Sequence, residues 1–351
     1  MNKEGASNDT SNFVKTAQTK CHHQPSTFAT PSDPHPCKVN RKSNWVSGRN
    51  WINFNGLLFN RCQMTDSLFL FKDFDESTYL KLNPDVSAAV EEQSFKSGLE
   101  HCLLHGIYED RPGVPDAIKI HMRSHSDDLT PPPGNLRARV HGDERLEEFI
   151  RVGKLLSYNL FSSFVSLTEK TSGNQILDFG CGCGRVISYL STLLMNNHFY
   201  GSDIDQEAIT WCKNNLSTIA EFTTNDTNPP LPFDDSFFDI VYSVSVFTHL
   251  PEEMQFLWLE ELKRVTRKGG YLFITTHGEE LAPVQIRKQV NDYGFHYGVG
   301  KGTDGLPDFY QTTFHTESYI RRHWSNYFEI VKIVKKGILS HQDLIICRRT
   351  T

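Results

Sequence analysis

The chain has 351 residues, a formal net charge of −6 and no basic block, and this balance argues against bulk binding to nucleic acid. No apolar run is long enough to span a membrane and no charged-then-apolar leader opens the chain, so a cytoplasmic protein without a membrane span is expected. The eight cysteines are scattered, which favours free thiols in a reducing compartment over a disulfide framework.

The N-terminal segment, residues 1–44, is rich in polar residues and proline and has no apolar period, so it is predicted to be a disordered tail. Two Cys/His groups fall in this tail, at residues 21–23 and 35–37. Their spacing fits no standard zinc pattern, so no metal site is predicted.

Residues 45–111 are predicted to form a small module that is helical in 74–111. Asp75 is placed to cap a first helix, Pro84 to begin a second, and Gly106 to end a third. This segment is similar to the short Y-L-x-x-N-P-D-V module found beside glycosyltransferase and methyltransferase domains of bacterial glycan assembly. The resemblance is short and indicates no chemistry by itself.

Residues 112–142 are predicted to be a linker and an arm. Three consecutive prolines at residues 131–133 break any helix in the linker. The arm, Leu136 to Gly142, is expected to lie over the main site. The amphipathic stretch from Asp143 to Leu167 is predicted to be the helix that precedes the first strand of an α/β domain.

The stretch from Asn174 to Asp203 reads as strand, glycine turn, helix and second strand. Its apolar run at residues 176–177 suits a buried parallel strand. The second strand, His198 to Ser202, ends at the acid Asp203. This order predicts the first βαβ half of a nucleotide-binding sheet.

The residues at these strand ends indicate which ligand the sheet binds. Gly180, Gly182 and Gly184 permit close approach to the backbone because they have no Cβ. Asp203 can accept hydrogen bonds from both hydroxyls of a ribose. Asp178 would repel a pyrophosphate but attract an ammonium group. The pattern therefore favours S-adenosylmethionine (SAM) over NAD or FAD, the alternative being glycines that serve packing only.

Further strands complete the predicted fold class, an α/β protein with a doubly wound, mostly parallel, seven-stranded Rossmann-like sheet. Pro251 is predicted to begin a helix that continues through Val265. The remaining strands are expected around Phe222, at Asp239 to Val246, after Gly269-Gly270, at Phe328 to Val334 and at Asp343 to Cys347.

Four ordered motifs within residues 145–350 resemble those of the class I SAM-dependent methyltransferases, close to the group called type 11 or 25. They are I-L-D-F-G-C-G-C-G-R, G-S-D-I-D, the segment from Pro230 to Leu250 and the segment from Arg267 to Thr276. The resemblance implies a methyltransferase domain at 143–351 with an insertion at 279–324. It also implies that SAM is bound by a set of residues: Asp178, Gly180, Cys181, Gly182, Gly184, Asp203, Ile204, Asn225, Asp226, Ser245 and Phe247.

Three histidines are candidate catalytic proton acceptors near the strand ends, where ligands bind in such sheets. His249 follows strand four, His277 ends strand five and His315 lies in the insertion. Each also has a structural alternative, as a helix cap or a turn residue. The family has no fixed catalytic residue, so the resemblance does not choose among the three.

One further segment resembles a methyltransferase signature, but its position in the chain argues against that assignment. Asn228-Pro229-Pro230-Leu231 is similar to the N-P-P-[YF] signature of amino-group methyltransferases. That signature belongs at the end of strand four, whereas here it precedes the strand and ends in leucine. Methylation of DNA or of a glutamine nitrogen is therefore not predicted.

The insertion at 279–324 is too rich in aromatic residues for a solvated linker and is long for a loop, so a lid over the acceptor is predicted. A dimerisation surface is the alternative. The aromatic residues are Tyr293, Phe295, Tyr297, Phe309, Tyr310 and Phe314.

The sequence as a whole predicts a SAM-dependent methyltransferase that acts on a small-molecule or glycan-intermediate substrate, with transfer to oxygen favoured over nitrogen. No nucleic-acid partner is expected. The alternatives are a non-catalytic SAM-binding or scaffold protein and an NAD-dependent nucleotide-sugar enzyme. The intact Asp178, glycine turn and Asp203 argue against the first alternative, and Asp178 with the G-x-G-x-G spacing argues against the second.

Overall fold

The computed structural model describes residues 51–54, 57–60, 74–95, 97–107, 109–116, 118–119, 129–168, 170, 172–299 and 306–350. The predicted tail at residues 1–44, with its two Cys/His groups, lies outside the described residues. The described residues all belong to one compact unit, Gly48–Thr351.

The N-terminal part of this unit is a small set of short elements. They are an antiparallel pair, β1 (Trp51–Phe54) and β2 (Leu57–Asn60), and the helical segments α2 (Glu76–Leu82), α3 (Pro84–Glu91), α4 (Gly98–His101) and η2 (Cys102–Gly106). Asp75 caps α2 by accepting the Thr78 N–H at 3.1 Å. Glu76 accepts the N–H groups of Gly98 and Leu99, which ties α2 to α4.

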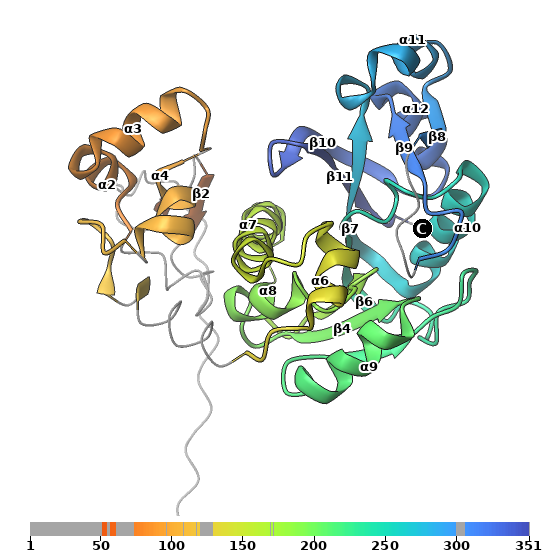
Figure 1. The fold of residues 1–351 in the computed structure, drawn as a ribbon, viewed down its shortest axis with the longest axis horizontal. Helices are drawn as coiled ribbons and strands as arrows, with labels where there is room; N and C mark the ends of the chain where they lie inside the picture. Colours follow the sequence, from red (N-terminus) through yellow and green to blue (C-terminus); the bar gives the residue numbers. More distant parts are fainter. Residues whose placement is uncertain are drawn as a thin grey trace, which may run out of the picture. The chain divides into compact units, whose positions relative to one another are not determined.

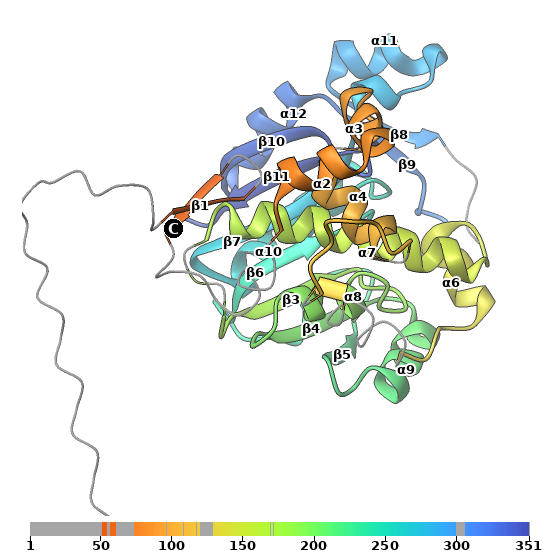
Figure 2. The same ribbon diagram turned by 90° about the vertical axis from the view of Figure 1, so that its left-hand side faces the viewer.

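A nine-stranded sheet organises the rest of the unit, and seven of its strands form the Rossmann-like order that the sequence predicts, while β8 and β9 branch from β7. The order of these seven strands is β10-β11-β7-β6-β3-β4-β5, and β10, β11 and β7 are paired antiparallel while the others are parallel. Figure 2 shows β6, β3, β4 and β5 following one another in this order. The strands are β3 (Gln175–Phe179), β4 (His198–Asp203), β5 (Glu221–Thr224), β6 (Phe238–Ser243), β7 (Thr266–Gly278), β10 (Glu329–Ile338) and β11 (Gln342–Arg348).

Both faces of the sheet are buried, because successive side chains of a strand point to opposite faces and both sets are apolar. Ile176, Ile240 and Phe273 belong to one buried cluster, whereas their chain neighbours belong to the other. Those neighbours are Leu177, Val241 and Ile274. The near-continuous apolar runs in the sequence thus follow from a sheet covered on two sides.

Helices cover the two faces. α7 (Leu146–Val165), α8 (Ile187–Leu193) and α9 (Gln206–Asn215) contribute to the first cluster. α10 (Glu252–Val265) and α12 (Glu317–His323) contribute to the second. Figure 1 shows α7 and α8 on one side of the strands and α10 on the other.

The stretch predicted as an insertion is not a simple loop. It forms η3 (Glu279–Leu281), α11 (Val284–Tyr293), β8 (Phe295–Val299), β9 (Thr312–His315), α12 and η4 (Trp324–Asn326). β9 pairs parallel with the end of β7, and β8 pairs antiparallel with β9. Several of its aromatic side chains therefore pack on the extended sheet instead of covering a ligand.

The order of the strands leaves a crevice at one place. β3 lies between β4 and β6, so the connections that leave β3 and β6 run in opposite directions, and ligands bind at such a point. β6 ends at Ser243, three residues before the predicted end at Val246. Ser245 has a φ of 62°, which turns the chain away from the sheet at the carboxyl end of β6.

The two-sided core predicts a contrast between two leucines of α10. Leu259 is fully buried against the sheet, whereas Leu257 is 51% exposed. Leu259→Ala should lower the free energy of unfolding by about 2–5 kcal/mol, because it leaves a cavity. Leu257→Ala, the matched control, should cost less than about 0.5 kcal/mol in the same urea titration. Equal losses would contradict the assignment of this helix face to the core.

Candidate functional site

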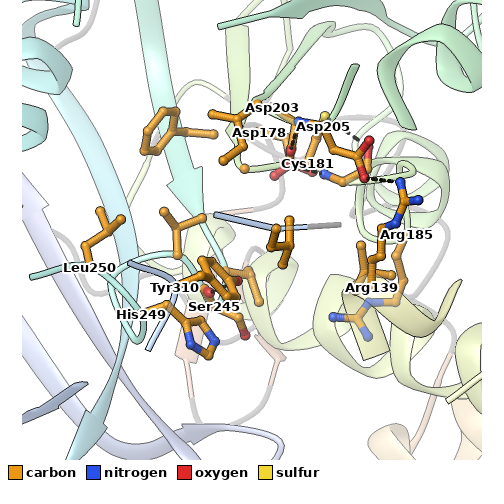
Figure 3. Close-up of a pocket in the computed structure, with 18 of the residues that line it drawn as sticks. Arg139, Asp178, Cys181, Arg185, Asp203, Asp205, Ser245, His249, Leu250 and Tyr310 are labelled. Atoms are coloured by element: carbon orange, nitrogen blue, oxygen red, sulfur yellow. Dashed lines mark hydrogen bonds and ion pairs between the residues drawn. The ribbon is translucent and has the colours of Figure 1, made fainter. Parts of the chain in front are cut away.

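A cavity of about 330 Å³ lies at the carboxyl ends of β3, β4, β5 and β6. Figure 3 shows carboxylates at one wall, with Tyr310 and His249 at another and two arginines at a third. Eight of the eleven residues predicted to bind SAM line this cavity: Asp178, Gly180, Cys181, Gly182, Asp203, Ile204, Asn225 and Ser245.

The glycine turn after β3 takes a backbone conformation that other residues rarely adopt. Gly180 and Gly182 have φ angles of 82° and 52°. A Cβ on Gly180 would lie 2.1 Å from Val246 Cγ2, and one on Gly182 would lie 2.3 Å from Val140 Cγ1. The turn therefore needs glycine both for its backbone angles and for the side chains that close over it.

Asp203 at the end of β4 is held by the glycine turn. Its Oδ2 accepts the Gly182 N–H at 2.7 Å, and its Oδ1 accepts the Asp205 N–H at 2.9 Å. Each oxygen keeps a lone pair, because a carboxylate has about four acceptor positions. Asp203 is thus oriented to accept two further hydroxyl groups, such as those of a ribose.

Asp178 is 2% exposed at the base of the cavity. Tyr242 donates a hydrogen bond to its Oδ2 at 2.9 Å. Burial, as the largest cause, raises the pKa of Asp178 to about 8. An ammonium group beside this carboxyl would favour its ionised form, which agrees with the ligand inferred from the sequence.

Three residues of the predicted SAM-binding set do not line the cavity. Gly184 packs against α9, where a Cβ would lie 2.5 Å from Leu216 Cδ1. Asp226 is exposed after β5. Phe247 is fully buried, and its ring packs against Trp324 at 5.4 Å.

A short helix covers the glycine turn, at the place where the sequence predicts an arm. α6 (Gly134–His141) contributes residues 138–141 to the cavity. Arg139 forms ion pairs with Asp205 at 2.8 Å and Glu207 at 2.7 Å, at the first turn of α9. The sequence did not reveal this link, because the partners lie more than 60 residues apart in the chain.

Arg185 also lines the cavity and was not among the predicted site residues. It is 9% exposed, and burial lowers its pKa to about 10. Its Nη1 donates to His141 Nδ1 at 3.2 Å. Within the described residues its Nε has no hydrogen-bond partner. The motif G-C-G-C-G-R contains this arginine, but only the fold places it beside the cavity.

His249 is the one candidate histidine of the three that lines the cavity. Its Nδ1 lies 3.0 Å from the Gln311 carbonyl, so Nδ1 carries the proton and Nε2 the lone pair. Tyr310 stacks on the ring at 4.0 Å between centroids and donates to the Ser245 carbonyl. Burial lowers the pKa of His249 to about 4, so the imidazole is neutral at pH 7.

His277 and His315 lie behind this wall. His277 Nδ1 lies 3.3 Å from the Thr313 carbonyl, and its ring is 6.2 Å from that of His249. His315 is 1% exposed, and its Nε2 donates to Gln255 Oε1 at 2.9 Å. The Gln255 amide in turn donates to the carbonyls of Phe247 and Leu250, so His315 joins β9 to α10.

Residues of the predicted lid meet the cavity at one place. Leu306, Phe309 and Tyr310 line it, whereas Tyr293 on α11 is 79% exposed. Residues 300–305 of the predicted lid lie outside the described residues. The Tyr297 hydroxyl donates to the Phe309 carbonyl at 2.8 Å, which ties the segment to β8.

The cavity fits an adenosyl cofactor with an amino-acid end. Asp203 has lone pairs for the ribose hydroxyls, and the glycine turn leaves room for a ligand against the backbone. Asp178 can face an ammonium group. Among the described residues, no group of three or more His, Cys, Asp or Glu side chains is arranged to hold a metal ion. In the same part of the chain, no helix combines the length and apolar character needed to cross a bilayer.

Comparison with known proteins agrees with this geometry. Residues 177–274 match the family described as a methyltransferase domain. Phthiotriol/phenolphthiotriol dimycocerosates methyltransferase 1 of Mycobacterium ulcerans (strain Agy99) is 36% identical over 106 residues, which are 30% of this chain and 38% of that protein. The fatty-acid O-methyltransferase of Mycolicibacterium smegmatis is 34% identical over 121 residues, 34% of this chain and 42% of that protein.

The chain therefore spans less than half the length of these curated relatives. Among solved structures, a SAM-dependent methyltransferase from Methanosarcina mazei covers 51% of this chain and 93% of its own. Its TM-score is 0.41 and its sequence identity is 22%.

The burial of His315 predicts how stability depends on pH. Burial lowers its pKa from 6.5 to about 3, so below pH 6.5 the unfolded chain binds a proton that the folded chain excludes. Stability should therefore fall as the pH is lowered from 6.5 toward 3. In His315→Gln that decline should be shallower by roughly 1.4 kcal/mol per pH unit, measured by urea unfolding. Identical slopes for the two proteins would contradict a neutral, buried His315.

Proposed function

We infer that this chain, whose residues 177–274 match a methyltransferase domain family, is a SAM-dependent methyltransferase that transfers a methyl group from SAM to an oxygen atom of a small-molecule acceptor. SAM supplies a methyl group made electrophilic by a positively charged sulfur. The chain supplies a cavity that positions it and the acceptor. The sugar-containing acceptor expected from the sequence stays a prediction.

The observation that carries this proposal is the link between the glycine turn and Asp203. The N–H of Gly182 fixes a carboxylate that faces the cavity at the point where the strand order reverses. A ribose-binding acid, a turn open to a ligand and a buried carboxyl at Asp178 then meet in one cavity.

Each part of the wall has a distinct task in the proposed reaction. Asp203 would hold the ribose hydroxyls, and Asp178 would face the ammonium group of the cofactor. α6 closes over the glycine turn and is held by the ion pairs of Arg139. Tyr310 and His249 close the opposite wall, which helps to exclude water from the reacting atoms.

Transfer to oxygen is favoured by the polar groups at this wall and by the relatives. The unprotonated Nε2 of neutral His249 could accept the proton of a hydroxyl acceptor, whereas a carboxylate acceptor would need no base. The names of the two relatives above indicate acceptors with long apolar parts. We therefore propose a lipid-like acceptor with a reactive oxygen.

Turnover of SAM is the direct test. The protein incubated with SAM and a lipid extract should release S-adenosylhomocysteine (SAH), and the labelled methyl group should appear in an organic-soluble product. Release of SAH without labelled product would point to hydrolysis or to another acceptor class. Absence of both, with SAH bound, would contradict a catalytic protein and favour a SAM-binding scaffold.

Asp203→Ala tests the cofactor site separately from turnover. It should weaken SAH binding by about 10- to 100-fold in calorimetry, as expected for losing charge-assisted hydrogen bonds worth about 1.5–3 kcal/mol. Asp234→Asn, an exposed acid before β6, is the control and should bind as the wild type does. Wild-type affinity in a folded Asp203→Ala protein would remove Asp203 from the site.

A further inference from the structure

A second cavity, of about 200 Å³, lies beside the first. The two share four wall residues: Val140, His141, Arg185 and Ser245. The other lining residues are apolar Val152 and Leu156 of α7, Ile338 at the end of β10 and Leu339 after it, together with His341 and Gln342. A ligand that entered it from the cofactor cavity would therefore pass Arg185 and then meet apolar surface.

Arg185 is the only cation that both cavities share within the described part of the chain. Its guanidinium is more than nine-tenths buried, its Nε lacks a partner there, and Nη1 contacts a neutral imidazole. Asp178 acts on this charge, but no ion pair within 4 Å involves Arg185 in the described part of the chain. A buried charge that is not paired at close range is costly, and an anion beside it offsets that cost. Arg139 differs in this respect, because Asp205 and Glu207 already neutralise it.

We propose that Arg185 binds the carboxylate of an apolar carboxylic acid, and that the second cavity receives the apolar body of this acid, which is the acceptor. The proposal rests on the proposed function and names its substrate class. A planar guanidinium pairs with a carboxylate through two parallel hydrogen bonds, and the unpartnered Nε is available for one of them.

The carboxylate bound by Arg185 could belong to the cofactor or to the acceptor, and the apolar part of the second cavity favours the acceptor. The amino-acid end of the cofactor carries one, but it has no apolar body that would need the space beside Leu156 and Ile338. A fatty acid has both parts. Half-buried Ser245, whose Oγ accepts a hydrogen bond from Gln342 at 2.9 Å, lines both cavities, as Arg185 does.

A carboxylate acceptor also agrees with the weak basicity of the nearby histidines. One carboxylate oxygen forms a bond to the methyl carbon as the bond from that carbon to sulfur breaks, and the electron pair stays on sulfur. The products are a neutral methyl ester and SAH, so no proton is released. His249, whose burial lowers its pKa to about 4, is then not needed as a base.

The test measures binding of octanoate to the full chain in the presence of saturating SAH. Octanol, which has the same chain length and no charge, is the control ligand. Wild-type protein should bind octanoate at least about tenfold more tightly than octanol, the effect of one charge-assisted pair. Arg185→Gln should abolish this preference and leave octanol and SAH binding within about twofold. Arg185→Lys keeps the positive charge and should retain part of the preference for octanoate over octanol. It is a second variant that tests the charge if Arg185→Gln does not fold.

Two further variants locate the site. Leu339→Trp, at the turn between β10 and β11, should weaken both octanoate and octanol because it fills the second cavity, with SAH binding unchanged. Arg151→Gln on α7 is the matched control, because its arginine pairs with Glu148 at the surface. It should leave all three affinities unchanged.

Three results would overturn the proposal. Equal octanoate and octanol affinities in the wild type would remove the carboxylate site. Loss of SAH binding in Arg185→Gln, with 5′-methylthioadenosine binding intact, would assign Arg185 to the amino-acid end of the cofactor. Octanoate binding unaffected by both Arg185→Gln and Leu339→Trp would place the acid elsewhere. Failure of the wild type to bind SAH would contradict the proposed function itself. Normal SAH binding without a preference for octanoate would contradict only the carboxylate site at Arg185.

Discussion

The hydrogen bond from the Gly182 N–H to Asp203 is the contact on which the site depends. It joins the turn after β3 to the end of β4, so two neighbouring strands orient one carboxylate. The turn is possible only because its glycines adopt positive φ angles. It is then closed from above by Val140 of α6 and from the side by Val246, which leave no space for a Cβ. A local backbone conformation thereby fixes both the ribose-binding acid and the shape of the cavity.

The charges around the cavity are distributed unevenly. Arg139 is neutralised by the first turn of α9, and its role is to hold α6 in place. Arg185 lies deeper, with its charge less well compensated by the chain. The same cavity therefore contains one arginine that organises the protein and another suited to a ligand. Both arginines line the same cavity, and their ion-pair partners distinguish their roles. Those partners cannot be identified from the sequence.

The C-terminal insertion illustrates how a fold uses aromatic residues that look functional in a sequence. β8 and β9 extend the sheet from the end of β7, and the rings of Phe295, His315 and Tyr319 pack together there. Tyr310 alone among the six predicted lid aromatics combines a place in the cavity wall with stacking on His249. The segment thus serves the core and the site at once.

The sequence by itself determined the sheet, the glycine turn and most of the cofactor side of the cavity. These features are local: short continuous apolar runs set the strands, Asp178 lies near the end of β3, and Gly180 follows that end directly. Strand four was predicted three residues too long, because the positive φ of Ser245 is not visible in the residue type.

The tertiary structure alone decided which distant side chains meet. Phe247 and His315 turned inward to Trp324 and Gln255, since burial of apolar surface and satisfaction of polar atoms settle such orientations after the chain has folded. Arg185 came to border two cavities only because α6, α7 and the β10–β11 turn, far apart in the chain, pack around it.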